Sequence, residues 1–240
     1  WGRWGIDWWL SSYCDEIIVL YPFEQAWYTR NGLTTNWYGW PLYNLFTLYQ
    51  KPTPKKHTIA FLPGSRRNEI KQMAPLFCQA MCNLATTHPE LSFLWVVPAC
   101  YEMEISALLQ NSGLLASRYR LETDPRKTLA ALAPCCAAAT KPGTITLELA
   151  LLHVPSVIAF RTSWLTHACA AFFFKAPYIG LPNLCAHEII FPELIQNNCT
   201  VDAITNNLLT LYKDICSQSA AHQKRCQQFQ ALHAYLSNRP

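Results

Sequence analysis

The sequence carries little charge for its length. Only 14% of its 240 residues are Asp, Glu, Lys or Arg, and the formal net charge is +4. The basic residues form no stripe with interleaved aromatic side chains, so the pattern excludes a nucleic-acid-binding surface. A mild positive charge instead suits an anionic membrane face or a phosphorylated ligand.

Long apolar runs are also lacking. The longest, residues 147–160, contains Glu148, His153 and Pro155 and is too short for a helix that crosses a bilayer. No membrane-spanning helix is therefore expected. The chain starts at Trp1 without a basic segment followed by an apolar one, so no secretory signal is predicted. We expect the chain to be part of a longer protein.

Paired cysteine motifs are absent as well. The eleven cysteines include no Cys-x-x-Cys pair and show no repeating spacing. A chain of this length can bury a core without disulfides. We therefore predict reduced thiols, a cytoplasmic protein and no metal site.

Apolar and aromatic residues are abundant instead. Hydrophobic residues make up 51% of the chain, and seven of the nine tryptophans fall within the first 40 residues. Tryptophan rings either fill a core or lie where protein meets lipid headgroups. The core interpretation is favoured.

Short apolar runs alternate with helical patterns from residue 56 to about 180. The expected strands are 58–62, 91–97, 118–121, 135–139 and 155–160, and the expected helices are 70–84, 102–110, 125–132, 143–152 and 162–174. Strands that alternate with helices predict a parallel sheet covered on both faces. This region is predicted to be a doubly wound α/β domain.

The flanking segments have different patterns. Three further helices are expected at 188–197, 201–212 and 217–236, with Thr200 as the N-cap of the second. The first 48 residues resemble the end of a preceding domain, with a helical start, a strand at 17–20 and a helix from Phe23. The predicted organisation is an incomplete domain at 1–48, a linker at 49–56, a complete domain at 57–215 and a final helical segment at 216–240.

The first candidate functional element is the turn after strand 58–62. Gly64 allows the backbone to bend tightly, Ser65 offers a hydroxyl, and Arg66 offers a forked cation suited to phosphate. Ligands of open α/β sheets bind outside the carboxyl ends of the strands, where this turn is expected. The alternative is an ordinary turn with a solvated basic pair, and the turn alone does not decide between them.

The second candidate is the turn before helix 143–152. A helix that begins at Gly143 and Thr144 directs unpaired N–H groups and a positive dipole end outward, which suits a diphosphate. Glu148 lies about one helical turn further on, where its carboxylate could accept hydrogen bonds from both ribose hydroxyls. In the alternative, Glu148 is a charge that complements the helix dipole. The two turns together are more specific than either alone.

These segments resemble the lipid A disaccharide synthase family. The resemblance rests on residues 61–70 (FLPGSRRNEI), 143–150 (GTITLELA) with Val154-Pro155, 177–184 (PYIGLPNL), 19–24 (VLYPFE) and 38–42 (YGWPL). It implies the GT-B architecture: a complete Rossmann-like C-terminal domain with a parallel sheet, preceded here by the tail of a similar domain. The final helix is then expected to pack back on that first domain.

The resemblance also implies a reaction. The family transfers 2,3-diacylglucosamine from UDP to 2,3-diacylglucosamine 1-phosphate, with inversion and without a metal or other cofactor. The implied location is the inner face of the cytoplasmic membrane, as a peripheral protein, and a homodimer is among the expected assemblies. The implied binding residues are Gly64, Ser65 and Arg66 near the phosphates, Gly143 and Thr144 at the diphosphate, Glu148 on the ribose, Asn183 in the cleft and Glu193 in the following helix. Arg66 would also stabilise the leaving group.

The chain departs from the family pattern at several positions. Pro142 stands where Ser usually precedes Gly-Thr, and Trp40 stands where His is usual. Ala186-His187-Glu188 replaces the common Ala-Gly-Arg-Glu, and the Gly-rich loop and the Asp general base are expected upstream of Trp1. The alternatives are another GT-B enzyme of UDP-N-acetylglucosamine, such as an epimerase or a peptidoglycan-type transferase, or a UDP-sugar-binding module or fragment without activity.

Two other features are weaker candidates. His153 and His167 lie in apolar patterns and are interpreted as packed residues. The apolar residues 168–174 are flanked by Arg161, Trp164 and Lys175, which also fits a helix that contacts lipid at the membrane interface.

Overall fold

The structure, a computed structural model, describes residues 6–49, 56–161 and 177–237. Its centre is a six-stranded parallel sheet with the order β5-β4-β3-β6-β7-β8. The strands are β3 (Lys56–Leu62), β4 (Ser92–Val96), β5 (Tyr119–Glu122), β6 (Cys135–Thr140), β7 (Ser156–Phe160) and β8 (Glu193–Ile195). The chain adds strands in one direction from β3 to β5 and then in the other from β6 to β8. This reversal places a topological switch point between β3 and β6.

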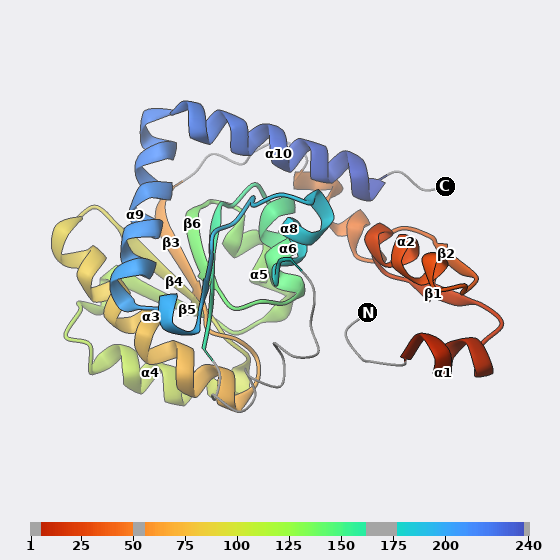
Figure 1. Ribbon diagram of the computed structural model, residues 1–240. Helices are drawn as coiled ribbons and strands as arrows, with labels where there is room; N and C mark the ends of the chain where they lie inside the picture. The colour runs from red at the N-terminus through yellow and green to blue at the C-terminus, as the bar shows by residue number, and fades with distance from the viewer. Residues whose placement is uncertain (1–5, 50–55, 162–176, 238–240) are drawn as a thin grey trace.

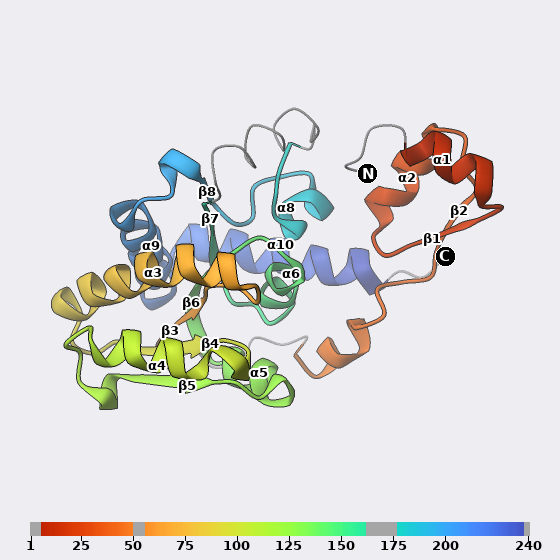
Figure 2. The ribbon, with the colours of Figure 1, turned by 90° about the horizontal axis from the view of Figure 1, so that it is seen from below.

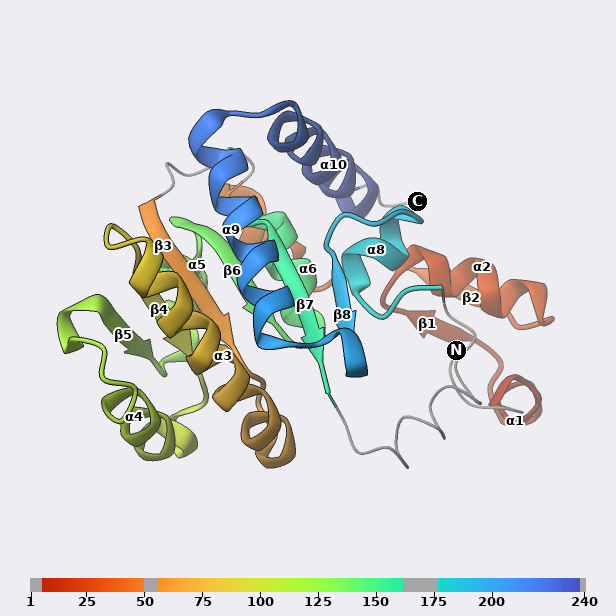
Figure 3. The ribbon, with the colours of Figure 1, turned by 60° about the vertical axis from the view of Figure 1, so that its left-hand side comes forward.

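Helices cover both faces of this sheet. They are α3 (Arg67–Thr87), α4 (Glu102–Gln110), α5 (Pro125–Leu132), α6 (Thr144–Leu151), α8 (Leu181–Ala186), α9 (Val201–Ser217) and α10 (Ala220–Ser237). Alternate residues of β3 point to opposite faces: Ile59 and Phe61 pack among α3, α4 and α9, whereas Ala60 and Leu62 pack with α5, α6 and α10. Figure 3 shows α3 and α9 on one side of the strands and α6 on the other. The prediction of a doubly wound α/β domain is confirmed.

The segment at 188–197 differs from the prediction of a helix. Its backbone forms β8 at the edge of the sheet, paired in parallel with β7, and the Ile158 N–H donates to the Pro192 carbonyl at 2.9 Å. Pro192 lacks an N–H and restricts the residue before it, which disfavours a helix through this position. The segment instead pairs with the free edge of β7 as a strand.

The first part of the chain forms a small unit beside the sheet. It contains α1 (Ile6–Tyr13), β1 (Ile17–Val19), α2 (Pro22–Arg30) and β2 (Thr35–Trp37), and β1 pairs with β2 in parallel. Figure 2 shows this unit to one side of the sheet domain. The core interpretation of the tryptophans holds for Trp37 and Trp40, which are buried, but not for Trp8 and Trp9, which are 71% and 54% exposed.

Two segments join this unit to the sheet domain. The 3-10 helix η1 (Tyr43–Tyr49) places buried Phe46 against Trp40 and α6, and α10 follows α9 across the molecule toward the first unit (Figure 1). The ring of His233 on α10 contacts Tyr43 edge-on, and its Nε2 lies 2.8 Å from the Leu151 carbonyl. The last helix therefore contacts both the sheet domain and the η1 segment that leads to it from the first unit.

Short 3-10 turns and helix caps complete the domain. The turns are η2 (Ala99–Tyr101), η3 (Ala116–Arg118) and η4 (Gln196–Asn198). Thr200 caps α9 as predicted, because its hydroxyl accepts a hydrogen bond from the Ala203 N–H at 3.1 Å.

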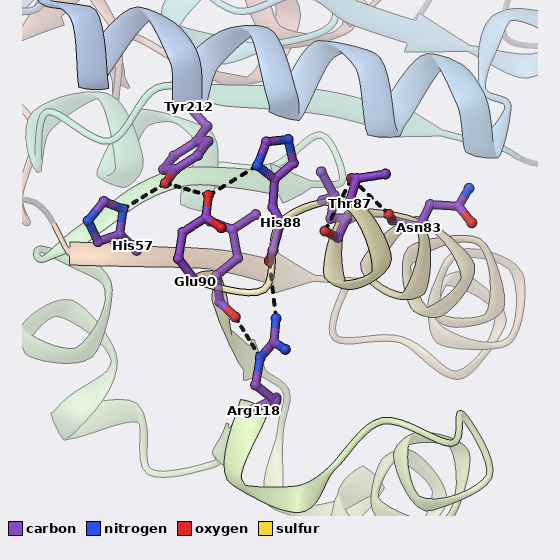
Figure 4. Close-up of polar contacts among 9 residues, drawn as sticks. His57, Asn83, Thr87, His88, Glu90, Arg118 and Tyr212 are labelled. Atoms are coloured by element: carbon purple, nitrogen blue, oxygen red, sulfur yellow. Dashed lines mark hydrogen bonds and ion pairs between the residues drawn. The ribbon is translucent and has the colours of Figure 1, made fainter.

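A polar cluster ties α9 to the amino ends of β3 and β4 (Figure 4). The Tyr212 hydroxyl lies 2.7 Å from His57 Nδ1 and donates to Glu90 Oε1 at 3.0 Å, and His88 Nδ1 lies 3.0 Å from the same carboxylate oxygen. Arg118 closes the cluster by donating to the carbonyls of the loop before β4. The cluster fixes the edge of the sheet opposite to the turns at Gly64 and Gly143.

Three predictions fall wholly or mostly outside the described residues: the helix at 162–174 with its hypothesis of lipid contact, the interpretation of His167 as a packed residue, and the linker at 49–56. No helix in the described ranges is long and apolar enough to span a membrane. Within the same ranges, no group of three or more His, Cys, Asp or Glu side chains is arranged to hold a metal ion.

Candidate functional site at the carboxyl edge of the sheet

A pocket of about 700 Å³ opens at the carboxyl ends of β3, β4, β5 and β6. Its wall includes the ends of all four strands and the first turns of α5 and α6. The lining residues are Leu62, Gly64, Ser65, Arg66, Val96, Val97, Pro98, Ala99, Thr123, Pro125, Thr128, Lys141, Gly143, Thr144, Ile145 and Glu148. The position agrees with the rule that open α/β sheets bind ligands at the switch point. The structure thus brings together six of the eight predicted site residues.

The turn after β3 has a geometry that requires glycine. Gly64 has φ +125°, and a Cβ at this position would lie 2.6 Å from Glu69 Oε2. Glu69 stands in the first turn of α3, and its Oε2 accepts the N–H groups of Ser65 and Arg66 at 3.1 and 3.2 Å. Only Glu69 accepts in this cap, because the Arg66 guanidinium has no acceptor atom, and the two hydrogen bonds of Glu69 shape the turn. It leaves the Arg66 side chain 82% exposed at the rim of the pocket.

Glu69 also pairs with a cation from across the switch point. Lys141 Nζ lies 3.1 Å from Glu69 Oε1, and the two side chains are 17% and 13% exposed. Burial alone would raise the pKa of Glu69, but the hydrogen bonds from Lys141, Ser65 and Arg66 outweigh it and lower the pKa. The Lys141 N–H also donates to the Leu62 carbonyl, at 3.3 Å, which joins the ends of β3 and β6.

The start of α6 faces the pocket. Gly143 is its N-cap, Thr144 is exposed, and the buried Thr146 hydroxyl donates to the Gly143 carbonyl at 2.7 Å. The first N–H groups of a helix have no partner within the helix, and they carry its positive dipole end. Pro142, just before, contributes no N–H. The helix end therefore presents N–H groups and a positive dipole end to the pocket, without a backbone donor at Pro142.

Glu148 lies one turn inside α6 and lines the pocket. Its carboxylate is half-buried and makes no hydrogen bond or ion pair within the described part of the chain, and desolvation by burial raises its pKa. A half-buried carboxylate without a partner is costly for a folded protein. Such a group in a pocket points to a ligand that donates hydrogen bonds.

Asn183 and Glu193 do not share this environment, and the expectation that Asn183 lines the cleft is corrected. Asn183 is fully buried, accepts the N–H groups of Ile190 and Phe191, and donates to the Phe191 carbonyl and to Glu193. Glu193 lies in β8 rather than in a helix, and it also accepts the N–H groups of residues 179 and 180. These partners fix the loop between α8 and β8, so both side chains have structural roles.

An ion pair beside the pocket was not predicted from the sequence: it joins Lys141, which lines the pocket, to Glu69. Lys141 precedes the α6 turn, and Glu69 belongs to the segment 61–70, but their pairing joins residues 72 positions apart. Neither spacing nor composition indicates such a contact. The only signal in the sequence is that both residues stand next to a candidate phosphate turn.

Two solved structures that share this fold contain UDP. The chain superposes on the S. aureus MnaA–UDP structure with a TM-score of 0.56 and 11% identity, covering 93% of this chain and 57% of the other. It superposes on a mutant of S. aureus TarM solved with UDP with a TM-score of 0.56 and 9% identity, covering 94% and 44%. At this identity the likeness shows the fold alone, that of a Rossmann-like GT-B domain.

The sequence comparisons identify the family. Residues 7–239 match the family model described as lipid-A-disaccharide synthetase. The chain is 33% identical over 231 residues to lipid-A-disaccharide synthase 2 of Legionella pneumophila strain Philadelphia 1, covering 92% of this chain and 58% of the relative. It is 30% identical over 233 residues to the lipid-A-disaccharide synthase of Albidiferax ferrireducens, covering 92% and 59%.

The chain thus spans less than two thirds of the length of these relatives. The family match nevertheless covers almost all of it, including both turns that line the pocket. The chain belongs to the lipid-A-disaccharide synthetase family.

Proposed function

We propose that this chain binds the UDP-sugar donor of a lipid A disaccharide synthase. The full reaction is the condensation of UDP-2,3-diacylglucosamine with 2,3-diacylglucosamine 1-phosphate, with inversion at the transferred sugar. The observation that carries the proposal is Glu148, a half-buried carboxylate without a partner in the described chain, one turn inside the helix that begins at the pocket. A vicinal diol such as that of ribose offers the two donors that this carboxylate lacks.

The other pocket residues fit the rest of the nucleotide. With the ribose at Glu148, the diphosphate reaches the amino end of α6 at Gly143 and Thr144, about one helical turn away. Arg66 and Ser65, from the facing turn, approach the phosphates from the other side of the switch point. The uracil then lies toward the wall formed by the ends of β4 and β5.

This arrangement supports the departure of UDP. In the transfer, the bond between the sugar C1 and the phosphate oxygen breaks, and its electron pair stays on UDP. The acceptor hydroxyl forms the new bond to C1 from the opposite face and gives up its proton to a general base. The Arg66 guanidinium and the α6 dipole stabilise the charge that develops on the diphosphate. The proposal assigns the general base to no described residue.

The proposed substrates indicate where in the cell the protein acts. Acyl chains partition into lipid, so an enzyme that joins two acylated sugars must reach the membrane surface. We propose a peripheral protein at the inner face of the cytoplasmic membrane, with no metal or other cofactor and with a homodimer as the assembly to test. A mild net positive charge supports the association with anionic lipid.

Isothermal titration calorimetry tests the donor assignment. We expect the 240-residue chain to bind UDP more tightly than uridine by at least about tenfold, because charge-assisted hydrogen bonds to phosphate each contribute roughly 1.5–3 kcal/mol. UDP-N-acetylglucosamine should compete with UDP for the same site. Absence of UDP binding by the folded chain would refute the proposal.

A further inference from the structure

Lys141 stands at the end of β6, directly above the start of α6. Its Nζ would lie 3.5 Å from a Cβ built on Gly143, so the ammonium covers the N-cap of the helix. The side chain lines the pocket and is only 17% exposed. A lysine has a long flexible stem and usually extends its charge into water. Here the charge is held inside the pocket instead.

The electrostatics of this position are unfavourable without an anion. A helix carries a partial positive charge at its amino end, so a cation next to Gly143 is repelled. Glu69 compensates for this repulsion at 3.1 Å, but Arg66 Nη1 shares the same carboxylate oxygen at 3.5 Å. Two cations and a helix end therefore face one carboxylate. The excess positive charge matches a doubly charged anion.

The hydrogen-bonding inventory of the loop points in the same direction. Pro142 has no N–H, so the residue that immediately precedes the N-cap cannot donate from its backbone. Lys141 carries three N–H donors, and Glu69 is the only partner of its ammonium within the described residues. At least one donor remains for a ligand at the helix end.

We propose that Lys141 is a further ligand of the diphosphate, which binds beside the Lys141 ammonium at the amino end of α6. The inference rests on the proposed function, because it deepens the description of the same pocket. Glu69 holds the lysine above Gly143 in the free protein. When the diphosphate arrives, Lys141 donates to a phosphate oxygen and remains next to Glu69. The phosphate then lies between Lys141 and Arg66.

Calorimetric titrations of wild type, Lys141→Met and Lys141→Arg with UDP, uridine and inorganic pyrophosphate test this role. We expect Lys141→Met to weaken the binding of UDP and of pyrophosphate at least about tenfold. The affinity for uridine should stay within about twofold of that of wild type. Lys141→Arg keeps a cation and should restore most of the loss. Lys213→Met, which removes an exposed lysine next to Tyr212 at the opposite edge of the sheet, is the matched control and should bind as wild type does.

The outcomes separate the inference from the proposed function. If wild type binds UDP and Lys141→Met, folded by circular dichroism, binds it equally well, the inference is overturned and the donor assignment stands. Another outcome is that wild type binds pyrophosphate in a way that depends on Lys141 but binds UDP no more tightly than pyrophosphate. In that case the inference is supported and the donor assignment fails. If wild type binds neither anion, both fail. An equal loss of uridine and UDP would show a structural effect and would also overturn the inference.

Discussion

Replacing Glu148 by Gln should stabilise the free protein while it impairs the pocket. The carboxylate is half-buried and has no partner among the described residues, and burial raises its pKa. A group whose pKa is raised in the folded state contributes its full stability below the pKa of the unfolded chain, about 4.3 for Glu. That contribution is lost as the pH rises through the higher folded value. At neutral pH the ionised Glu148 therefore destabilises the fold.

The magnitude follows from the cost of burying an unsatisfied polar group. That cost is about 1–3 kcal/mol for a fully buried group, and Glu148 still reaches water, so we take about 1 kcal/mol. A neutral amide of the same shape avoids the charge. For a domain of this size, about 1 kcal/mol corresponds to an increase in Tm of roughly 2–4 °C.

Thermal unfolding without ligand, from pH 4 to pH 8, measures this effect. We expect Glu148→Gln to exceed wild type in Tm at pH 8 and to approach it near pH 4, where the carboxyl group is mostly protonated in both the folded and the unfolded chain. Glu188→Gln, at an exposed position, is the control and should show no such dependence on pH. A Glu148→Gln variant that is less stable than wild type at pH 8 would refute the reasoning, because it would show that the carboxylate has a stabilising partner.

Three further predictions concern the framework of the site. Gly64→Ala should lower the free energy of unfolding by roughly 1–3 kcal/mol, because φ is +125° and the new Cβ would meet Glu69; unchanged urea denaturation would contradict this. Asn183→Ala should lower the free energy of unfolding by roughly 3 kcal/mol, because it leaves buried backbone groups without partners. A stable variant that has lost UDP binding would instead place Asn183 in the site. Burial lowers the pKa of His233, so the unfolded chain binds this proton more tightly and stability should fall as the pH drops below about 6.5. His233→Gln should flatten that dependence. An unaltered pH profile of Tm in the variant would contradict this prediction.

The sequence predicted the sheet and most of the helices because their patterns are local. Continuous apolar runs such as 58–62 identify buried parallel strands, and the helix predicted at 70–84 contains residues that recur every three to four positions on one buried face. The edge strand β8 was mistaken for part of a helix. Its three residues are too few to show a period, and their state depends on the free edge of β7.

The site was predicted in outline from its two turns. Glycines and a helix start leave a signature in the sequence, so Gly64, Gly143 and Glu148 were expected at one pocket, and the structure places them there. Contacts between distant positions have no such signature. The pair of Lys141 with Glu69 depends on the order of the strands, which brings β3 and β6 together.

The same reason explains why the structure places Asn183 outside the pocket. The family resemblance of segment 177–184 implied that Asn183 lines the cleft. The fold instead uses its amide as a bridge to the loop before β8, with four hydrogen bonds inside the protein. Only the three-dimensional arrangement shows that these bonds leave no capacity for a substrate.

Calorimetry with UDP on wild type and Glu148→Ala tests the central claim most directly. If the carboxylate accepts the ribose hydroxyls at the carboxyl edge of the sheet, the variant should bind UDP more weakly by about 1–3 kcal/mol. The binding of pyrophosphate, which lacks ribose, should stay the same. Equal affinity of the two proteins for UDP would contradict the assignment of Glu148 to the ribose.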